Sequence, residues 1–155
     1  MSNIKQFDAE NFTLSNNAKT VSDFKENNWK KTLISEKSSI ECAISSLDKA
    51  GMQILLVVSD SRELIGTITD GDIRRGLLRG LELKNSIEAL VNKNAFVVPI
   101  SMDNEIIIKI MSANGIKQIP VVNENRKVVG LHTWDNLTVK AELSNPMVIM
   151  AGGIG

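Results

Sequence analysis

Apolar residues follow two patterns along the chain, one helical and one typical of buried strands. From Ser39 to Ala50 they recur at three- and four-residue spacing, which predicts a helix whose core-facing stripe is Ile40, Ala43, Ile44 and Leu47. The runs 54–58 and 119–122 are apolar and bounded by polar turns, so each is predicted to be a buried strand. A short strand is expected at 32–34. Residues 1–29 are polar and rich in Asn and Ser, and we expect an irregular or partly helical arm there.

These elements occur twice. Shifting the sequence by 64 residues places Gly51, Val57, Val58, Arg62, Gly66 and Thr69 on Gly115, Val121, Val122, Arg126, Gly130 and Thr133. Both Gly51 and Gly115 stand where a helix should end, a position that often needs a left-handed conformation. Each copy is predicted to be strand, helix, strand, strand, helix. A unit this small cannot bury a sufficient core alone, so the predicted α/β (α+β) fold has two pseudo-symmetric repeats packed through their sheets. Residues 83–91 join the copies, with a short helix from Ser86.

Composition removes several classes of function. Eighteen basic residues balance eighteen acidic ones, so no electrostatic footprint for nucleic acid or an anionic membrane is present. Cys42 is the single cysteine and we expect it to be buried beside the helical stripe; with no cysteine partner and no Cys/His cluster, neither an internal disulfide nor a metal site is expected. No apolar run is long enough to cross a bilayer. We expect a soluble, cytoplasmic protein without a tightly bound cofactor and without catalytic residues of its own.

A Thr-x-x-Asp sequence ends the third strand of the first copy. Thr69 and Asp72 have the spacing of a helix N-cap and an acidic N3 residue, which would stabilise the next helix by roughly 1 kcal/mol with no ligand. A carboxylate also accepts hydrogen bonds through both of its oxygens, so the same two residues are a candidate binding site. Asn136 replaces the aspartate in the second copy, so we expect the first site to dominate.

The duplicated unit, the Gly-x-x-Thr-x-x-Asp ending and the Ile-Pro-Val-Val strand together resemble a tandem pair of CBS domains, often called a Bateman module. The resemblance covers roughly residues 30 to 143, and we expect the first repeat at 30–82 and the linker with the second repeat at 83–144. It implies an adenine nucleotide (AMP, ADP or ATP) held between the repeats as a regulatory ligand, and a homodimer.

The resemblance also implies where that ligand lies. The hydroxyl of Thr69 would meet the phosphate or ribose, and Asp72 would accept from the ribose hydroxyls. The base pocket would map onto 32–34 and 52–54, and the two arginines one turn into the next helix would meet a phosphate. Trp134 could stack on a ligand in the second cleft. The expected ligand-binding residues are Thr32, Leu33, Ile34, Met52, Gln53, Ile54, Thr69, Asp72, Arg74, Arg75, Thr133 and Asn136.

Residues 145–155 carry a second resemblance. Val148-Ile-Met-Ala-Gly-Gly-Ile-Gly155 resembles the first strand and nucleotide-binding loop of sugar nucleotidyltransferases, without the Thr-Arg-Leu that continues that loop. The Thr-Asp-Gly-Asp-Ile-Arg-Arg stretch is also similar to the paired repeats of sugar-phosphate isomerases. We therefore expect a regulatory module that precedes a nucleotidyltransferase domain, which would join a sugar phosphate to a nucleoside triphosphate. The alternatives are a structural dimerisation module with empty clefts and an enzyme in its own right.

Overall fold

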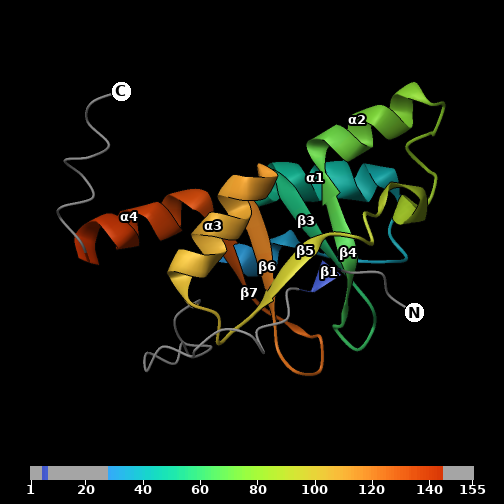
Figure 1. Cartoon of the computed structure of the whole chain (residues 1–155). Coiled ribbons are helices and arrows are strands. Elements are labelled where there is room, and N and C mark those ends of the chain that lie inside the picture. Colours follow the sequence, from blue (N-terminus) through green and yellow to red (C-terminus); the bar gives the residue numbers. More distant parts are fainter. Residues whose placement is uncertain (1–4, 7–27, 145–155) are drawn as a thin grey trace, which may run out of the picture.

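The computed structural model describes residues 5–6 and 28–144, which form two β-sheets packed against each other with helices around them (Figure 1). The first sheet has the order β2-β3-β4 and the second has the order β1-β5-β6-β7. The strands are β1 (Lys5–Gln6), β2 (Leu33–Ser35), β3 (Ile54–Val58), β4 (Leu64–Thr69), β5 (Phe96–Pro99), β6 (Gln118–Val122) and β7 (Val128–Thr133). The helices are η3 (Asn28–Thr32), α1 (Ile40–Ala50), α2 (Asp70–Leu78), η4 (Ile87–Leu90), α3 (Asn104–Asn114) and α4 (Trp134–Ser144). The expected fold class is confirmed.

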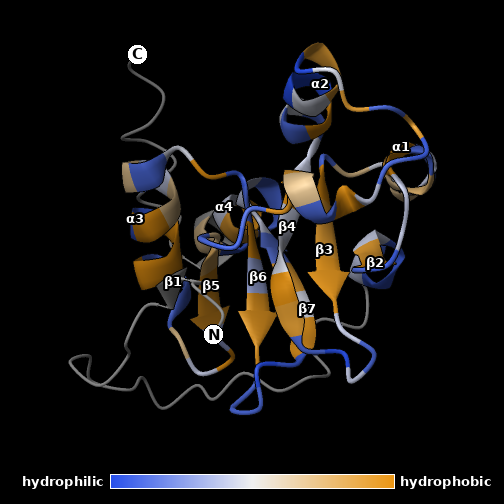
Figure 2. Cartoon of the chain, turned by 90° about the vertical axis from the view of Figure 1, so that its right-hand side faces the viewer, coloured by the Kyte–Doolittle hydropathy of each residue, from blue (hydrophilic) through white to orange (hydrophobic). Residues whose placement is uncertain are grey.

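The two repeats agree down to single backbone angles. In each, a parallel strand pair is followed by an antiparallel hairpin, and the register shifts at Val57/Val58 and again at Val121/Val122. Both hairpin turns close with an arginine in the left-handed region, at φ 66° and φ 61°. The glycines that end α1 and α3 both have φ 63°, as predicted for a left-handed helix end. The turns lie at the same end of the molecule (Figures 1 and 2).

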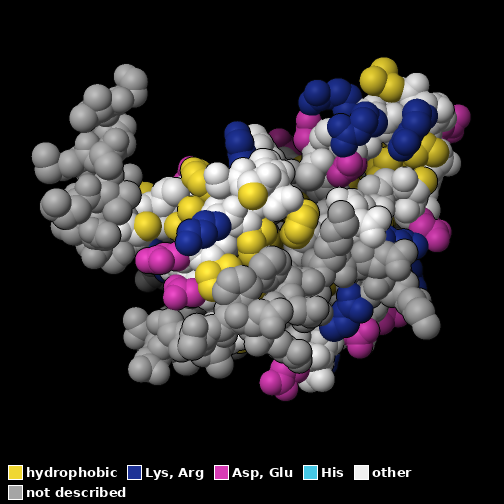
Figure 3. Space-filling view, in the orientation of Figure 1, with side chains coloured by type: hydrophobic (Ala, Val, Ile, Leu, Met, Phe, Trp, Pro, Cys, Tyr) yellow, Lys and Arg dark blue, Asp and Glu magenta, His cyan; other side chains and the backbone are white. Residues whose placement is uncertain are grey.

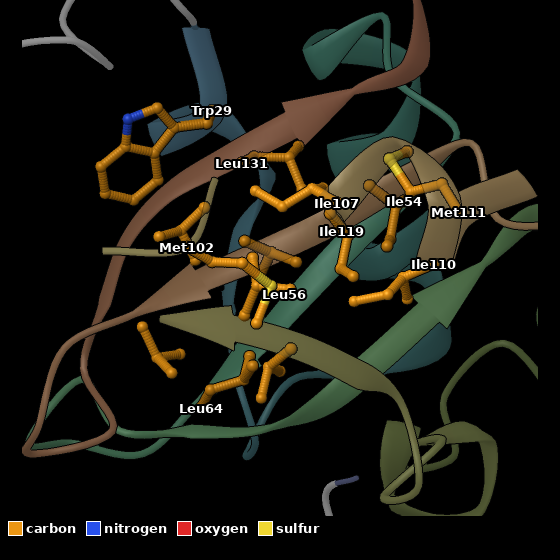
Figure 4. Close-up of a cluster of buried hydrophobic side chains, with 14 of the residues drawn as sticks. Trp29, Ile54, Leu56, Leu64, Met102, Ile107, Ile110, Met111, Ile119 and Leu131 are labelled. Atoms are coloured by element: carbon orange, nitrogen blue, oxygen red, sulfur yellow. The ribbon is translucent and has the colours of Figure 1, made fainter. Parts of the chain in front are cut away.

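Alternation along β3 explains how the sheets meet. Ile54 and Leu56 point toward the second repeat and join Ile107, Ile119 and Leu131 in one buried cluster (Figure 4). The residue between them, Leu55, belongs to a separate cluster under α1 and α2. Successive side chains of a strand point to opposite faces, so β3 is covered on both sides and reads as a continuous apolar run. Figure 2 shows the strands as the most hydrophobic part of the fold and the hairpin turns as hydrophilic.

The linker between the repeats lies close against β4. The Thr67 N–H donates to the Asn92 carbonyl at 3.2 Å, and the Asn92 N–H donates back to Thr67 at 2.8 Å. Gly66 allows this approach, because a Cβ there would lie 2.5 Å from the Asn92 oxygen. The predicted short helix is η4, capped by the Ser86 hydroxyl. The linker is therefore fixed to the first repeat before β5 begins the second.

Some expectations differ from the structure. Cys42 is exposed, so its predicted burial is wrong, because the apolar stripe of α1 does not extend to its side of the helix. Ile44 was expected in the core but is 38% exposed, since α1 turns that position toward a cleft. Within the arm, Lys5–Gln6 form a strand paired in parallel with β5, not a helical or irregular segment.

Three further expectations concern the first strand, residues 145–155 and membrane-spanning helices. Thr32 ends η3, and the strand expected at 32–34 is β2 at Leu33–Ser35. The strand and glycine loop expected at 145–155 lie outside the described residues. Within residues 5–6 and 28–144, no helix combines the length and apolar character that a bilayer crossing requires.

Candidate functional site

A cleft of about 1040 Å³ opens between the two repeats. The first repeat contributes α1, the start of β3, the end of β4 and the start of α2. The linker and the turn into β6 supply the opposite wall. Pockets for small molecules and cofactors commonly measure about 300–1,000 Å³, so a nucleotide would fit. Its lining residues include Ile44, Leu47, Asp48, Met52, Gln53, Ile54, Thr67, Thr69, Asp70, Gly71, Asn92, Asn94, Ala95, Phe96 and, from the second repeat, Gly115, Ile116, Lys117, Gln118 and Pro120.

Strand pairing places these residues together. Ile54 opens β3 and pairs with Thr69 at the end of β4, so the chain entering β3 lies beside the chain leaving β4. The helix α2 starts at that point. The paired hydrogen bonds between Thr67 and Asn92 hold the linker against the same end of β4. The cleft wall is thus built on strand ends and on a fixed linker.

Thr69 and Asp72 form a complete capping box at the start of α2. The Thr69 N–H and Thr69 hydroxyl each donate to Asp72 Oδ2 at 2.8 Å, and the Asp72 N–H donates to Thr69 Oγ1 at 3.3 Å. Thr69 lines the cleft, whereas Asp72 stands behind it and is not among the lining residues. The capping role expected from the sequence is therefore realised by Thr69, which lines the cleft, and by Asp72, whose carboxylate is hydrogen-bonded to it.

The two arginines of α2 are held by carboxylates of the same helix. Arg74 donates to Asp70 Oδ2 at 2.5 Å, and Arg75 donates to Asp72 Oδ1 at 2.7 Å. Both guanidinium groups are largely exposed, and neither lines the cleft. Over α2, at the upper right of Figure 3, Lys and Arg side chains mix with Asp and Glu. A pair exposed on both sides, such as Arg74–Asp70, contributes about 0–1 kcal/mol, whereas the Asp72 carboxylate is only 23% exposed.

The expected base pocket is divided between two places. Residues 52–54 line the cleft beside Thr69. Thr32 is fully buried, and its hydroxyl donates to the Trp29 carbonyl. Leu33 and Ile34 instead line a smaller cavity of about 450 Å³ near the hairpin turn of the first repeat.

Trp29 and Asp60 also line the smaller cavity. Lys37 Nζ donates to Asp60 Oδ2 at 2.7 Å, and this contact raises the pKa of Lys37 above its ordinary value. The Asp60 carboxylate in the wall of this cavity therefore already has a cationic partner.

The second repeat carries different side chains at the positions that correspond to this cleft. Where the first repeat has Thr67, Asp70 and Leu47, the second has larger or apolar residues that are partly or fully buried: Leu131, Trp134 and Met111. The Asn136 N–H donates to Thr133 Oγ1 at 3.3 Å, so the cap survives. Neither Thr133 nor Asn136 lines the two cavities found among the described residues. The repeats keep one backbone but differ in the side chains that would form a cleft.

Sequence reasoning missed the linker and the second repeat's share of the cleft. The positions 116–118 correspond to 52–54 after the 64-residue shift, and both sets line the same space. The repeat itself was therefore a signal for them. The linker residues around Asn92 carry no such signal, because hydrogen bonds between distant segments bring them there. Within the described part of the chain, no cluster of His, Cys, Asp and Glu could hold a metal ion.

Curated relatives are similar to this chain over only part of their own length. An uncharacterised protein of Rickettsia prowazekii, RP505, is 29% identical over 107 residues, which cover 69% of this chain and 33% of the relative. The arabinose 5-phosphate isomerase KdsD of Pseudomonas aeruginosa is 28% identical over 94 residues, 60% of this chain and 29% of the isomerase. This chain thus spans about a third of the length of such relatives.

Solved structures share the fold over most of their length. PAE2072 of Pyrobaculum aerophilum, a CBS domain protein complexed with AMP, has a TM-score of 0.63 at 19% identity and covers 72% of this chain and 89% of its own. The CBS domain pair of MJ0100, in complex with 5′-methylthioadenosine and S-adenosyl-L-methionine, has a TM-score of 0.63 at 26% identity and covers 70% and 89%.

The profile of the CBS domain family matches residues 30–79 and again residues 87–137. These two stretches hold the two copies of the strand and helix pattern, with η4 at the start of the second. The repeated backbone, the packing of the sheets and the cleft between the copies all lie within them. The chain therefore belongs to the CBS domain family, in which it is a tandem pair.

Proposed function

We propose that this chain is a regulatory module that binds an adenine nucleotide in the cleft between its repeats. The observation that carries the proposal is the cleft itself, which is wide enough for a nucleotide, is lined by both repeats and has Thr69 in its wall. Two chains of the same fold were solved with adenosine compounds, AMP in one and S-adenosyl-L-methionine in the other. CBS pairs are typically regulatory and not catalytic.

The proposed contacts follow from the cleft lining. The apolar residues at the start of β3, Met52 and Ile54, and Ile44 on α1 would cover the faces of the base. The Thr69 hydroxyl would meet the ribose or phosphate, and Asp72 would accept a ribose hydroxyl by exchanging one of its capping bonds. For Arg74 or Arg75 to meet a phosphate, each would first release its carboxylate partner, at small cost for the exposed Arg74–Asp70 pair and at a larger cost for Arg75, because Asp72 is mostly covered.

Regulation would act by linkage. Because residues of both repeats line one cleft, a ligand there contacts both at once. A ligand that binds one arrangement of the repeats better than another shifts their equilibrium by that difference in affinity. An attached domain that senses the arrangement would then be activated or inhibited.

We further propose that the attached domain is a sugar nucleotidyltransferase that follows the pair. Residues 148–155 support this through their resemblance to the strand and glycine loop of that family. The similarity to an arabinose 5-phosphate isomerase supports the broader theme of sugar-phosphate enzymes. The reaction would be carried out by that domain and not by the CBS pair.

Thermal denaturation with and without nucleotide tests the proposal. A ligand that binds only the folded state stabilises it by about 2.7 kcal/mol at a hundred times its Kd, so AMP, ADP or ATP should raise Tm. Thr69→Ala and Asp72→Ala should remove most of that rise, while Asn136→Ala, at the matched position of the second repeat, should retain it. Comparing each variant with its own ligand-free Tm separates binding from the lost cap. A full rise in both first-repeat variants would contradict the assigned cleft.

A structural dimerisation module is the second candidate. The complete capping box favours it, because Thr69 and Asp72 already have partners without a ligand. Under this candidate none of the three nucleotides would change Tm at millimolar concentration.

Under both candidate functions we propose a homodimer, since symmetric two-fold dimers are the commonest oligomers. Light scattering at micromolar concentration should give about twice the 17.0 kDa chain mass. A particle with the mass of one chain would contradict the dimer. It would not bear on nucleotide binding, which the Tm measurements test separately.

A further inference from the structure

The charged side chains in the cleft are few and mostly acidic. Asp48 on α1 and Asp70 at the start of α2 contribute two carboxylates. Lys117, from the turn into β6, is the one lysine or arginine among the described residues that line the cleft. Carboxylates repel phosphate groups, so the number of phosphates that the cleft tolerates depends on this cation.

The helix α2 adds no net positive charge. A helix N-terminus normally attracts anions through its free N–H groups and its dipole. Here the first turn carries Asp70 and Asp72, and the Asp72 N–H is already bonded to Thr69. The two arginines that follow are bound to these same carboxylates. With Asp48 and Lys117 included, three carboxylates balance three cations.

Size does not limit the ligand. A cleft of about 1040 Å³ has room for a triphosphate as well as a monophosphate. Each phosphate beyond the first would add negative charge beside Asp48 without a further cation among the lining residues, because Arg74 already neutralises Asp70 and does not line the cleft. Electrostatics, and not shape, therefore sets the preference.

Lys117 is well placed to link the ligand to the second repeat. It follows the left-handed Gly115 that ends α3, and Gln118 after it begins β6. Its carbonyl accepts the Trp134 N–H at 2.8 Å, so its backbone is fixed to the start of α4. Its side chain is exposed and free to reach a phosphate across the cleft, opposite the first repeat.

We infer that the cleft selects a nucleoside monophosphate over the triphosphate, and that Lys117 of the second repeat binds the single phosphate. This inference rests on the proposed function and adds the ligand's charge class and its contact with the second repeat. The phosphate then bridges the repeats: the nucleoside is held by the first repeat and its charge by the second.

Calorimetric titration of adenosine, AMP and ATP at low salt tests this, with the wild-type chain and with Lys117→Gln. One hydrogen bond to a charged group contributes about 1.5–3 kcal/mol, so Lys117→Gln should weaken AMP binding about tenfold or more and leave adenosine within about twofold. The wild type should bind AMP more tightly than ATP. Lys109→Gln, at an exposed lysine of α3 that does not line the cleft, is the matched control and should bind all three like the wild type.

Tighter binding of ATP than of AMP, or an equal loss for adenosine and AMP in Lys117→Gln, would overturn the inference while the proposed function stands. So would a selective loss of AMP affinity in Arg74→Gln with none in Lys117→Gln, because the phosphate would then lie at α2. Absence of binding by all three compounds would instead overturn the proposed function itself.

Discussion

Gly66 shows how one residue determines the shape of the cleft wall. The linker crosses β4 so closely that a Cβ at this position would lie 2.5 Å from the Asn92 carbonyl oxygen and 2.6 Å from Cγ1 of Val91. The Asn92 oxygen is a backbone atom that also accepts the Thr67 N–H, so it cannot move without losing that hydrogen bond. A side chain at position 66 would therefore displace the linker.

Gly66→Ala should lower the free energy of unfolding by about 1–3 kcal/mol, the usual range for overpacking a buried site. The matched control is Gly71→Ala, in the first turn of α2, where the nearest atom to an added Cβ is the end of the Arg75 side chain at 3.1 Å. That group can shift, and alanine favours a helix, so Gly71→Ala should be neutral or stabilising. Urea denaturation checks both. Equal stability of the two variants would contradict the close approach.

Helix α1 has two different apolar faces. Ile40 and Ala43 are fully buried under the first sheet, whereas Ile44 on the same helix is 38% exposed and lines the cleft. Apolar spacing predicted one stripe for all three, because periodicity reports which residues share a side of a helix. It does not report what covers each part of that side.

The two faces should respond differently to substitution. Ile40→Ala should cost about 2–5 kcal/mol of stability, because it leaves a cavity in a packed core. Ile44→Ser should change stability by less than about 1 kcal/mol, as expected at a position a third exposed, but should weaken AMP binding. Denaturation and AMP titration of both variants check this. Strong destabilisation by Ile44→Ser would show that its apolar contact is a core contact.

Features that depend on interactions between residues close in sequence could be predicted, whereas features that depend on contacts between distant segments could not. Helix α1, the glycine at its end and the apolar strand β3 depend on local spacing and backbone preference, so they were found. The 64-residue repeat gave the packing of the sheets. The linker wall depends on hydrogen bonds between Thr67 and Asn92, which no local pattern contains. The contact of Arg74 with Asp70, one helical turn back, follows the i,i+4 spacing of the sequence and competes with the phosphate contact expected for Arg74.

In the whole molecule, the two repeats share one backbone pattern but carry different side chains at the positions that line the open cleft. Leu131 and Trp134 occupy positions that are Thr67 and Asp70 in the first repeat, and Leu131 is fully buried. The second repeat instead reaches into the first cleft through the residues before β6. Residues of both repeats therefore line this one cleft.

This asymmetry predicts one nucleotide per chain. Equilibrium dialysis with saturating AMP should give one bound AMP for each chain, including in a dimer, because the second repeat has Leu131 and Trp134 where the first has the cleft residues Thr67 and Asp70. A ratio of two per chain would show that Trp134 moves aside for a ligand.

Amide chemical-shift mapping during titration with AMP reports where the nucleotide lies on the CBS pair. We expect saturable shifts at the cleft-lining segments 52–54, 69–71, 94–96 and 115–118, with little change at 29–35 and 58–62 around the smaller cavity. Shifts concentrated at that smaller cavity, or no saturable shift at millimolar AMP, would contradict the proposed binding in the cleft.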